Sequence, residues 1–126
     1  MEDKVPQAVI IIFGLSIILL IISSVKLFNI YNMLNDDVIT HLDFSGSPDK
    51  KGGKIHLIYG LLVNLGVLIL MYFLIKHPKY ANYPVEINDE NRSSAYLKMR
   101  YLVSILSLIT STSFLWMILI QEVKKV

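Results

Sequence analysis

Three long apolar runs constrain the fold of this chain more than any other feature. They cover residues 7–28, 55–75 and 102–121, and apart from Lys26 they contain no Asp, Glu, Lys or Arg. A helix needs about 20 apolar residues to cross a bilayer. The hydrophobic content of 54% and the mean hydropathy of +0.56 also exceed what a soluble domain of 126 residues uses for its core. We therefore expect a single membrane domain, 1–126, of the all-α class, with three transmembrane helices and a structured polar loop between the first two.

The first run is predicted to be a signal anchor that stays in the membrane. Its apolar block is longer than that of a secretory signal, and no small-x-small cleavage site follows it. Lys and Arg are divided equally between the two sides of the predicted topology, so the positive-inside rule does not choose an orientation. The group Arg92, Lys98 and Arg100 just before the third run favours a cytoplasmic N-terminus.

Several classes of function are excluded or disfavoured by composition. The chain has no cysteine, which excludes disulfides, thiolate zinc sites and cysteine nucleophiles. A net charge of only +2 gives no sign of the strongly basic surface that nucleic-acid-binding proteins use. The sequence has no nucleophile elbow, P-loop or HExxH motif, and no paired carboxylates within the apolar runs. We therefore expect no enzymatic activity, no cofactor and no resident metal.

The polar loop 34–54 holds most of the residues that chemistry or recognition can use. Asp43-Phe44-Ser45-Gly46 fits a type I turn, and Pro48-Asp49 fits the centre of a second turn. Before them, residues 38–44 alternate with a period of two, which predicts a short extended segment lying against helix ends, the bilayer interface or a partner. The candidate residues of this signature loop, with structural or partner-binding roles, are Asp36, His41, Asp43, Gly46, Pro48, Asp49, Gly52 and Lys54.

A second polar loop, 77–98, is expected between the second and third helices. Asn88 is predicted to cap a polar helical stretch that lies at the membrane interface before the chain turns into the third span. Within the spans, Asn64 is costly in lipid unless it is bonded, so we expect it to face the bundle interior and bond Ser107 or Ser111. The serine spacing predicts close helix packing. The candidate intramembrane polar residues are Asn64, Ser104, Ser107 and Ser111.

Two stretches of the chain are similar to the motifs of a known family. They read His41-x4-Gly46-x-Pro48-Asp49-x2-Gly52-x-Lys54, preceded by Leu34-x-Asp36, and Asn82-Tyr83-Pro84-Val85 followed by Ile87, Glu90, Asn91 and Tyr96. They resemble a bacterial membrane domain of unknown function found at the N-terminus of Sdp-type toxin immunity proteins. The chain departs from the family pattern at Asn35, Ile39, Leu42, Asp43 and Lys51, where the family usually has Pro, Pro, Phe, Asn and Trp.

The resemblance implies a multi-pass protein of the bacterial cytoplasmic membrane, with a role in immunity to a membrane-active peptide toxin or in associated signalling. It also singles out a second motif, whose candidate residues are Asn82, Tyr83, Pro84, Glu90 and Asn91.

The leading hypothesis is a small, non-enzymatic integral membrane protein that acts as a protein- or peptide-interacting accessory or as an immunity-like protein. Its expected partners are the lipid bilayer and another membrane protein or a membrane-active peptide toxin. Two alternatives stay open. One is a metal-binding membrane enzyme or sensor that uses His41, Asp43 and Asp49, since imidazole and carboxylate are metal-ligand types. The other is a subunit of an oligomeric transporter, because three helices alone enclose little space.

Overall fold

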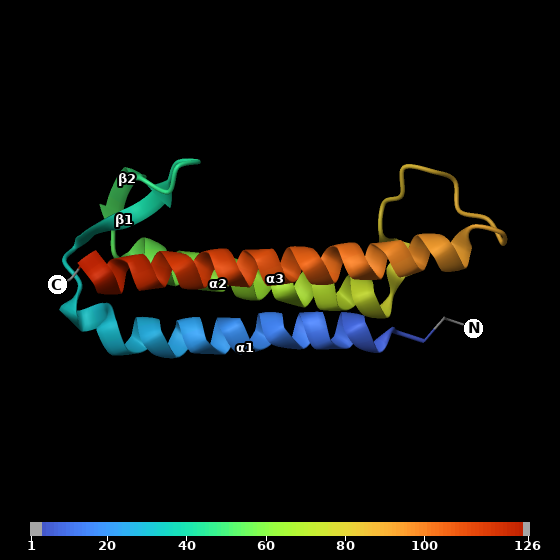
Figure 1. Ribbon diagram of the computed structural model, residues 1–126, viewed down its shortest axis with the longest axis horizontal. Coiled ribbons are helices and arrows are strands. Elements are labelled where there is room, and N and C mark those ends of the chain that lie inside the picture. Colours follow the sequence, from blue (N-terminus) through green and yellow to red (C-terminus); the bar gives the residue numbers. More distant parts are fainter. Residues whose placement is uncertain (1–3, 125–126) are drawn as a thin grey trace.

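Three long helices form the body of the protein in the computed structural model, which describes residues 4–124 (Figure 1). They are α1 (Gln7–Ile30), α2 (Ile55–Lys76) and α3 (Arg92–Lys124). Figure 1 shows α1 and α3 running in the same direction, with α2 running opposite to both. Each helix is long and apolar enough to cross a membrane. The predicted domain 1–126 includes residues 1–3 and 125–126, which lie outside the described residues.

The prediction of an all-α chain needs one correction, because the first polar loop contains a small sheet. A 3-10 turn, η1 (Tyr31–Met33), leads into β1 (Asp37–Leu42), which pairs antiparallel with β2 (Pro48–Gly53). This hairpin lies at the end of the bundle where α3 finishes (Figure 1). The second polar loop lies at the opposite end and begins with η2 (Pro78–Tyr80).

The helices pack through faces whose buried residues repeat at coiled-coil spacing. In α1 these residues are separated alternately by four and three positions: Val9, Phe13, Ser16, Leu20, Ser23, Leu27 and Ile30. A repeat of this kind keeps one seam of a helix against its neighbour. Two of the seven are serines, whose small side chains let helix backbones approach closely. The most extensive helix–helix contact is therefore between α1 and α3.

The serine residues predicted in the third helix are fully buried. Ser104, Ser107 and Ser111 are all inaccessible, as are Ser16 and Ser23 of α1. Most of these hydroxyls are satisfied within their own helix; for example, Ser107 donates to the carbonyl of Val103 at 2.8 Å. Serines bonded in this way act as small packing residues, which agrees with the predicted role of the stripe.

The third helix differs from its predicted span of 102–121. It is continuous over 33 residues, with no turn between its polar first part and its apolar run. At 1.5 Å per residue it measures about 50 Å, well beyond the roughly 30 Å of a hydrocarbon core. The predicted cap at Asn88 is present: its Oδ1 accepts the backbone N–H groups of Glu90 at 2.9 Å and Asn91 at 3.0 Å. The polar stretch is thus the first part of α3.

Candidate functional site

The tip of the hairpin is a three-residue loop built on the predicted type I turn. The N–H of Gly46 donates to the carbonyl of Asp43 at 3.0 Å, and the N–H of Asp43 donates to the carbonyl of Ser47 at 2.9 Å. Gly46 has φ +85°, so a type I turn is followed by a left-handed glycine, a common hairpin connection. The turn at residues 43–46 agrees with the sequence prediction.

We expect Gly46→Val to weaken the hairpin through its backbone alone. An added Cβ meets no atom within 4 Å, so there is no clash. A β-branched residue held at φ +85° instead costs about 1–3 kcal/mol. Gly46→Asn is the control, because asparagine tolerates this conformation. Thermal melting in detergent should show a lower midpoint for the valine variant only. Normal melting of Gly46→Val, together with loss of partner binding, would make Gly46 a contact residue.

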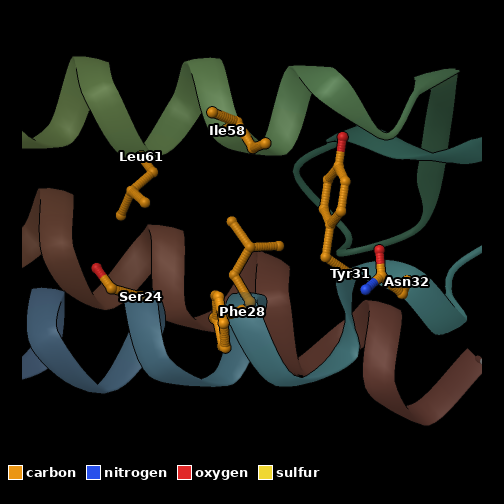
Figure 2. A pocket seen from close by; sticks show the side chains of 7 residues that line it. Ser24, Phe28, Tyr31, Asn32, Ile58 and Leu61 are labelled. Carbon is orange, nitrogen blue, oxygen red and sulfur yellow. The ribbon is translucent and has the colours of Figure 1, made fainter.

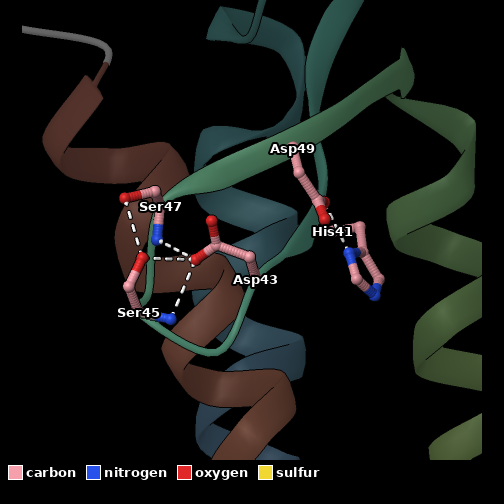
Figure 3. A network of polar contacts seen from close by, with 5 residues as sticks. All are labelled: His41, Asp43, Ser45, Ser47 and Asp49. Atoms are coloured by element: carbon pink, nitrogen blue, oxygen red, sulfur yellow. Dashed lines mark hydrogen bonds and ion pairs between the residues drawn. The ribbon is translucent and has the colours of Figure 1, made fainter.

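The carboxylate of Asp43 organises the tip (Figure 3). Its Oδ1 accepts the hydroxyl of Ser45 at 2.6 Å, the N–H of Ser45 at 2.9 Å and the N–H of Ser47 at 3.0 Å. These bonds favour the ionised form, the Ser45 hydroxyl most strongly and the Ser47 N–H next, and they hold the pKa of Asp43 below its ordinary value of 3.8. The turn is therefore built around a carboxylate that stays charged at neutral and mildly acidic pH.

We predict an acid-dependent loosening of the hairpin tip. Because the pKa of Asp43 is lower in the folded state, its contribution is fully present above the ordinary value of 3.8 and is lost as pH falls through the folded-state pKa. Amide exchange at Ser45 and Ser47, corrected for intrinsic rates, should stay constant from neutral pH to about pH 5 and rise below that range. In Asp43→Asn the acid-dependent step should vanish. A step that persisted in this variant would belong to another group.

The predicted second turn at Pro48-Asp49 is wrong, because these residues begin β2. Pro48 pairs with Leu42, and further along the ladder Lys50 pairs with His41. Proline has no N–H to donate, so it is tolerated at the first position of a strand. A single turn at residues 43–46 thus closes the loop.

His41 and Asp49 come together, but the third member of the predicted metal set does not join them. The Nδ1 of His41 lies 2.5 Å from the Oδ1 of Asp49 across the hairpin (Figure 3). Asp43 uses its Oδ1 within the turn instead. Among the described residues there is no group of three or more His, Asp or Glu side chains arranged to hold a metal ion. The pair is exposed to solvent and joins the two strands.

The base of the hairpin is fixed to the bundle by Gln121, which the sequence predicts only as the last residue of the third span. The side-chain amide of Gln121 donates from Nε2 to the carbonyl of Ile39 and accepts the N–H of Ile39 at Oε1, 3.3 Å away. The Gln121 side chain thereby hydrogen-bonds the unpaired backbone groups on the free edge of β1, as the backbone of a neighbouring strand would. Both residues are 4% exposed, so the two bonds form away from water.

The predicted alternation along β1 fails at its centre. Val38 and Ile39 are consecutive yet both are buried, at 5% and 4% exposure. Val38 packs with the helix residues Leu27, Leu57 and Ile118. Successive side chains of a strand point to opposite faces, so both faces of β1 are covered at this point; the register shifts only further along, between Ile39 and His41. The strand therefore buries two neighbouring side chains here, instead of burying only every second side chain along one face.

The remaining signature residues close the base of the hairpin. The N–H of Lys54 donates to the carbonyl of Asp36 at 3.0 Å. The Nζ of Lys54 donates to the carbonyl of Tyr31 at 3.3 Å and lies 4.7 Å from the centre of the Tyr31 ring. At Gly52, an added Cβ would meet Thr40 Cγ2 at 3.2 Å, so the two strands approach closely there. Asp36, Gly52 and Lys54 therefore lie together at the base of the hairpin, where Asp36 contributes its backbone carbonyl.

Two hollows flank this hairpin. One, of about 380 Å³, lies between α1 and α2 beside the base and is lined by Tyr31, Asn32 and Ser24 with apolar neighbours (Figure 2). The other, of about 290 Å³, lies between the hairpin and the last turns of α3. Its lining is almost wholly apolar and comprises Leu42, Gly46, Pro48, Trp116, Leu119, Ile120 and Val123. Phe44 at the tip is fully exposed.

The second motif lies at the other end of the bundle and so does not join the signature loop (Figure 1). The hydroxyl of Tyr83 donates to the carbonyl of Pro78 at 2.6 Å, and its ring lies 5.9 Å from that of Tyr96. Burial, and then the neighbouring Tyr96, raise the pKa of Tyr83. Asn91 donates from Nδ2 to the carbonyl of Glu86 at 2.9 Å. Tyr83 and Asn91 thus shape the loop, whereas three motif residues are exposed: Asn82, Pro84 and Glu90.

Arg100, a presumed marker of orientation, is buried and bonded. Its Nε donates to the carbonyl of Ile75 at 2.8 Å, in the last turn of α2. A cation is favourable there because the last carbonyls of a helix lack partners and carry partial negative charge. The residue therefore joins α3 to the end of α2.

Asn64 faces the bundle interior, as expected, and is 2% exposed. Ser111 donates to its Oδ1 at 3.4 Å, whereas Ser107 bonds within its own helix. Within residues 4–124, no partner is found for the Nδ2 of Asn64. The predicted interhelical bond is thus present, and it leaves the donor half of the amide unpaired.

Comparison with protein-family models, curated proteins and solved structures finds no match to this chain.

Proposed function

We propose that this chain is a multi-pass, non-enzymatic protein of the bacterial cytoplasmic membrane that binds a protein or peptide through its hairpin. The three apolar helices support the membrane assignment. In the proposed topology the N-terminus and the second polar loop lie inside, and the hairpin and the end of α3 lie outside. The cluster of basic residues before the third apolar run supports this orientation.

The observation that carries the proposal is a fully exposed aromatic side chain on a firmly attached hairpin. Phe44 is fully exposed, yet its turn is held by three bonds to Asp43 and its strand by Gln121. A pre-ordered aromatic anchor loses little conformational entropy on binding. Aromatic residues are also frequent among the side chains that dominate binding energy.

The surroundings of the hairpin favour a partner that lies in the membrane interface. The apolar hollow beneath it is lined by Trp116 and Ile120, which belong to the apolar run of α3. A peptide that inserts its apolar face at this depth can reach both the hollow and Phe44. This chemistry agrees with the membrane-active peptide toxin that the sequence resemblance implies, and we propose such a peptide, or a segment of another membrane protein, as the ligand.

The test is photo-crosslinking in living bacteria with a photoreactive residue in place of Phe44. Phe28 of α1 is the matched control, because it is an exposed phenylalanine away from the hairpin tip, at 83% exposure. We expect a discrete protein or peptide adduct from position 44 and lipid adducts from position 28. Lipid adducts alone at position 44 would make Phe44 a membrane anchor and contradict the proposal.

The immunity role has its own assay. Expression of the chain in cells sensitive to an Sdp-type toxin should raise survival, and Phe44→Ser should remove that protection. If the chain is present in the membrane and survival does not rise, the immunity role is contradicted and only the proposed binding role is left.

A further inference from the structure

A lateral groove between α1 and α2 is a feature that the proposed function leaves unused. These two helices contact each other less than either contacts α3, and they leave about 330 Å³ open at the end of the bundle away from the hairpin. On the α1 side the groove extends from Val5 to Ile17, and on the α2 side it is lined by Tyr72, Ile75 and Lys76. Figure 1 shows this end, where the start of α1 lies beside the end of α2.

The groove begins at headgroup level and runs into one leaflet. Helix α2 has 22 residues and is about 33 Å long, close to the roughly 30 Å of the hydrocarbon core. Its last residue, Lys76, therefore lies at the membrane interface in the proposed topology. Along the α1 wall, the distance from Val9 to Ile17 is about 12 Å. An acyl chain of the same leaflet can thus lie along the groove while its headgroup stays beside Lys76.

The walls of the groove suit an acyl chain better than another helix. Ile10 and Ile17 present large apolar side chains that are 58% and 40% exposed. Helix–helix interfaces in membranes are instead enriched in small residues, and Gly14 is the one residue of that kind among the described residues of the lining. Apart from Tyr72 and Lys76, the lining is apolar and offers no side-chain hydrogen bond to a neighbouring helix.

The mouth of the groove is positively charged. Lys76 is exposed, and the described residues of the lining include no Asp or Glu. The Nζ of Lys76 lies 5.9 Å from the centre of the Tyr72 ring, which also lines the groove. Behind this wall, Arg100 donates to the carbonyl of Ile75 at 2.8 Å and adds a buried positive charge. Each Lys or Arg near a membrane surface favours anionic lipid by roughly fivefold.

We propose that an anionic phospholipid binds in this groove, with an acyl chain between α1 and α2 and its phosphate beside Lys76. In the proposed topology the groove opens to the cytoplasmic leaflet, whose surface is negatively charged because of its anionic lipids. Basic pockets between membrane helices on that side bind anionic headgroups. The bound lipid fills the gap between the start of α1 and the end of α2. This inference goes beyond the proposed function, since it needs the membrane-spanning topology but not binding at Phe44.

Quenching of a single tryptophan by brominated lipids tests the site. Trp116 is the only tryptophan, so Trp116→Phe gives a background without one. In that background Tyr72→Trp reports on the groove and Tyr59→Trp is the matched control, because both are exposed tyrosines of α2 and each lies four residues from one end of the helix. In equimolar vesicles of phosphatidylglycerol and phosphatidylcholine, each lipid is brominated in turn. We expect a preference for phosphatidylglycerol of roughly fivefold at position 72 and close to one at position 59.

The role of the charge is tested by Lys76→Gln in the Tyr72→Trp protein. This change should lower the preference for phosphatidylglycerol to about one. Lys79→Gln is the control, because it removes the same charge at an exposed position outside the groove, and it should leave the preference unchanged. Equal quenching by the two lipids at position 72, or equal effects of the two lysine variants, would overturn the proposal.

The role of the groove is tested by filling it. An added Cβ at Gly14 meets no atom within 4 Å, so Gly14→Leu places its side chain in the open groove and should lower the preference at position 72. Gly66→Leu is the control, because Gly66 has the same open surroundings but lies outside the groove. An unchanged preference in Gly14→Leu would overturn the proposal. So would quenching by both lipids that is much weaker at position 72 than at position 59, because a protein segment would then occupy the groove.

Discussion

Replacing Gln121 with leucine is expected to release the hairpin from the bundle. Leucine has a similar volume but removes both bonds to the backbone of Ile39. The N–H and C=O of Ile39 then stay buried without partners, at a cost of about 1–3 kcal/mol each. Because every 1.4 kcal/mol is about a tenfold change in an equilibrium constant, amide exchange in β1 should rise by at least about tenfold.

The matched control for this variant is Glu122→Gln. The neighbouring Glu122 forms an ion pair with Lys26 at 3.5 Å, in which both side chains are about 40% exposed. Exposed pairs of this kind contribute roughly 0–1 kcal/mol. Hydrogen exchange in nanodiscs therefore separates the two variants. Equal, small effects of Gln121→Leu and Glu122→Gln would show that the hairpin does not depend on the Gln121 amide.

The second large effect is expected for Arg100→Met. This change keeps much of the apolar stem but removes the guanidinium that bonds the carbonyl of Ile75 in a site that is 2% exposed. A buried hydrogen bond from a charged group is worth about 1.5–3 kcal/mol. The midpoint of unfolding in mixed detergent should fall accordingly.

Lys98→Met provides the comparison for Arg100→Met. Lys98 lies half a turn away on the same helix, and its side chain is exposed. Removal of its charge should leave the midpoint almost unchanged. If both variants shifted the midpoint equally, the effect would come from net charge at this end of the bundle and not from the bond to α2.

The positions of the three helices are predictable from sequence because the physical cause is local. Twenty apolar residues in succession are sufficient evidence of a helix that can cross a membrane. The predicted limits 7–28 and 55–75 are therefore close to Gln7–Ile30 and Ile55–Lys76. Hydropathy gives no information about the polar first part of α3, so the sequence predicts a separate polar segment there, whereas α3 already begins at Arg92.

The hairpin was predictable only in part because its pairing involves distant residues. Asp43 and Gly46 specify their turn through local chemistry. Pro48 fits both a turn and the first position of a strand, and only pairing with β1 decides between them. Gln121 is 82 residues from Ile39, and nothing in the local pattern around it indicates a strand partner. Similarly, the position of Asn64 predicts a bond to Ser107 or Ser111, of which the structure has the second, but it does not predict that the Nδ2 of Asn64 stays unpaired.

The central claim is that a bundle of three membrane-spanning helices fixes the hairpin on one face of the membrane. Labelling of single cysteines placed on either side of the membrane tests this claim most directly. Lys50→Cys marks the hairpin and Glu90→Cys marks the second polar loop; both positions are exposed, and the chain has no other cysteine. In intact bacterial cells, a membrane-impermeant maleimide should label Lys50→Cys, and it should label Glu90→Cys only after the cells are permeabilised. Labelling of both positions in intact cells, or of neither, would contradict the three-span bundle.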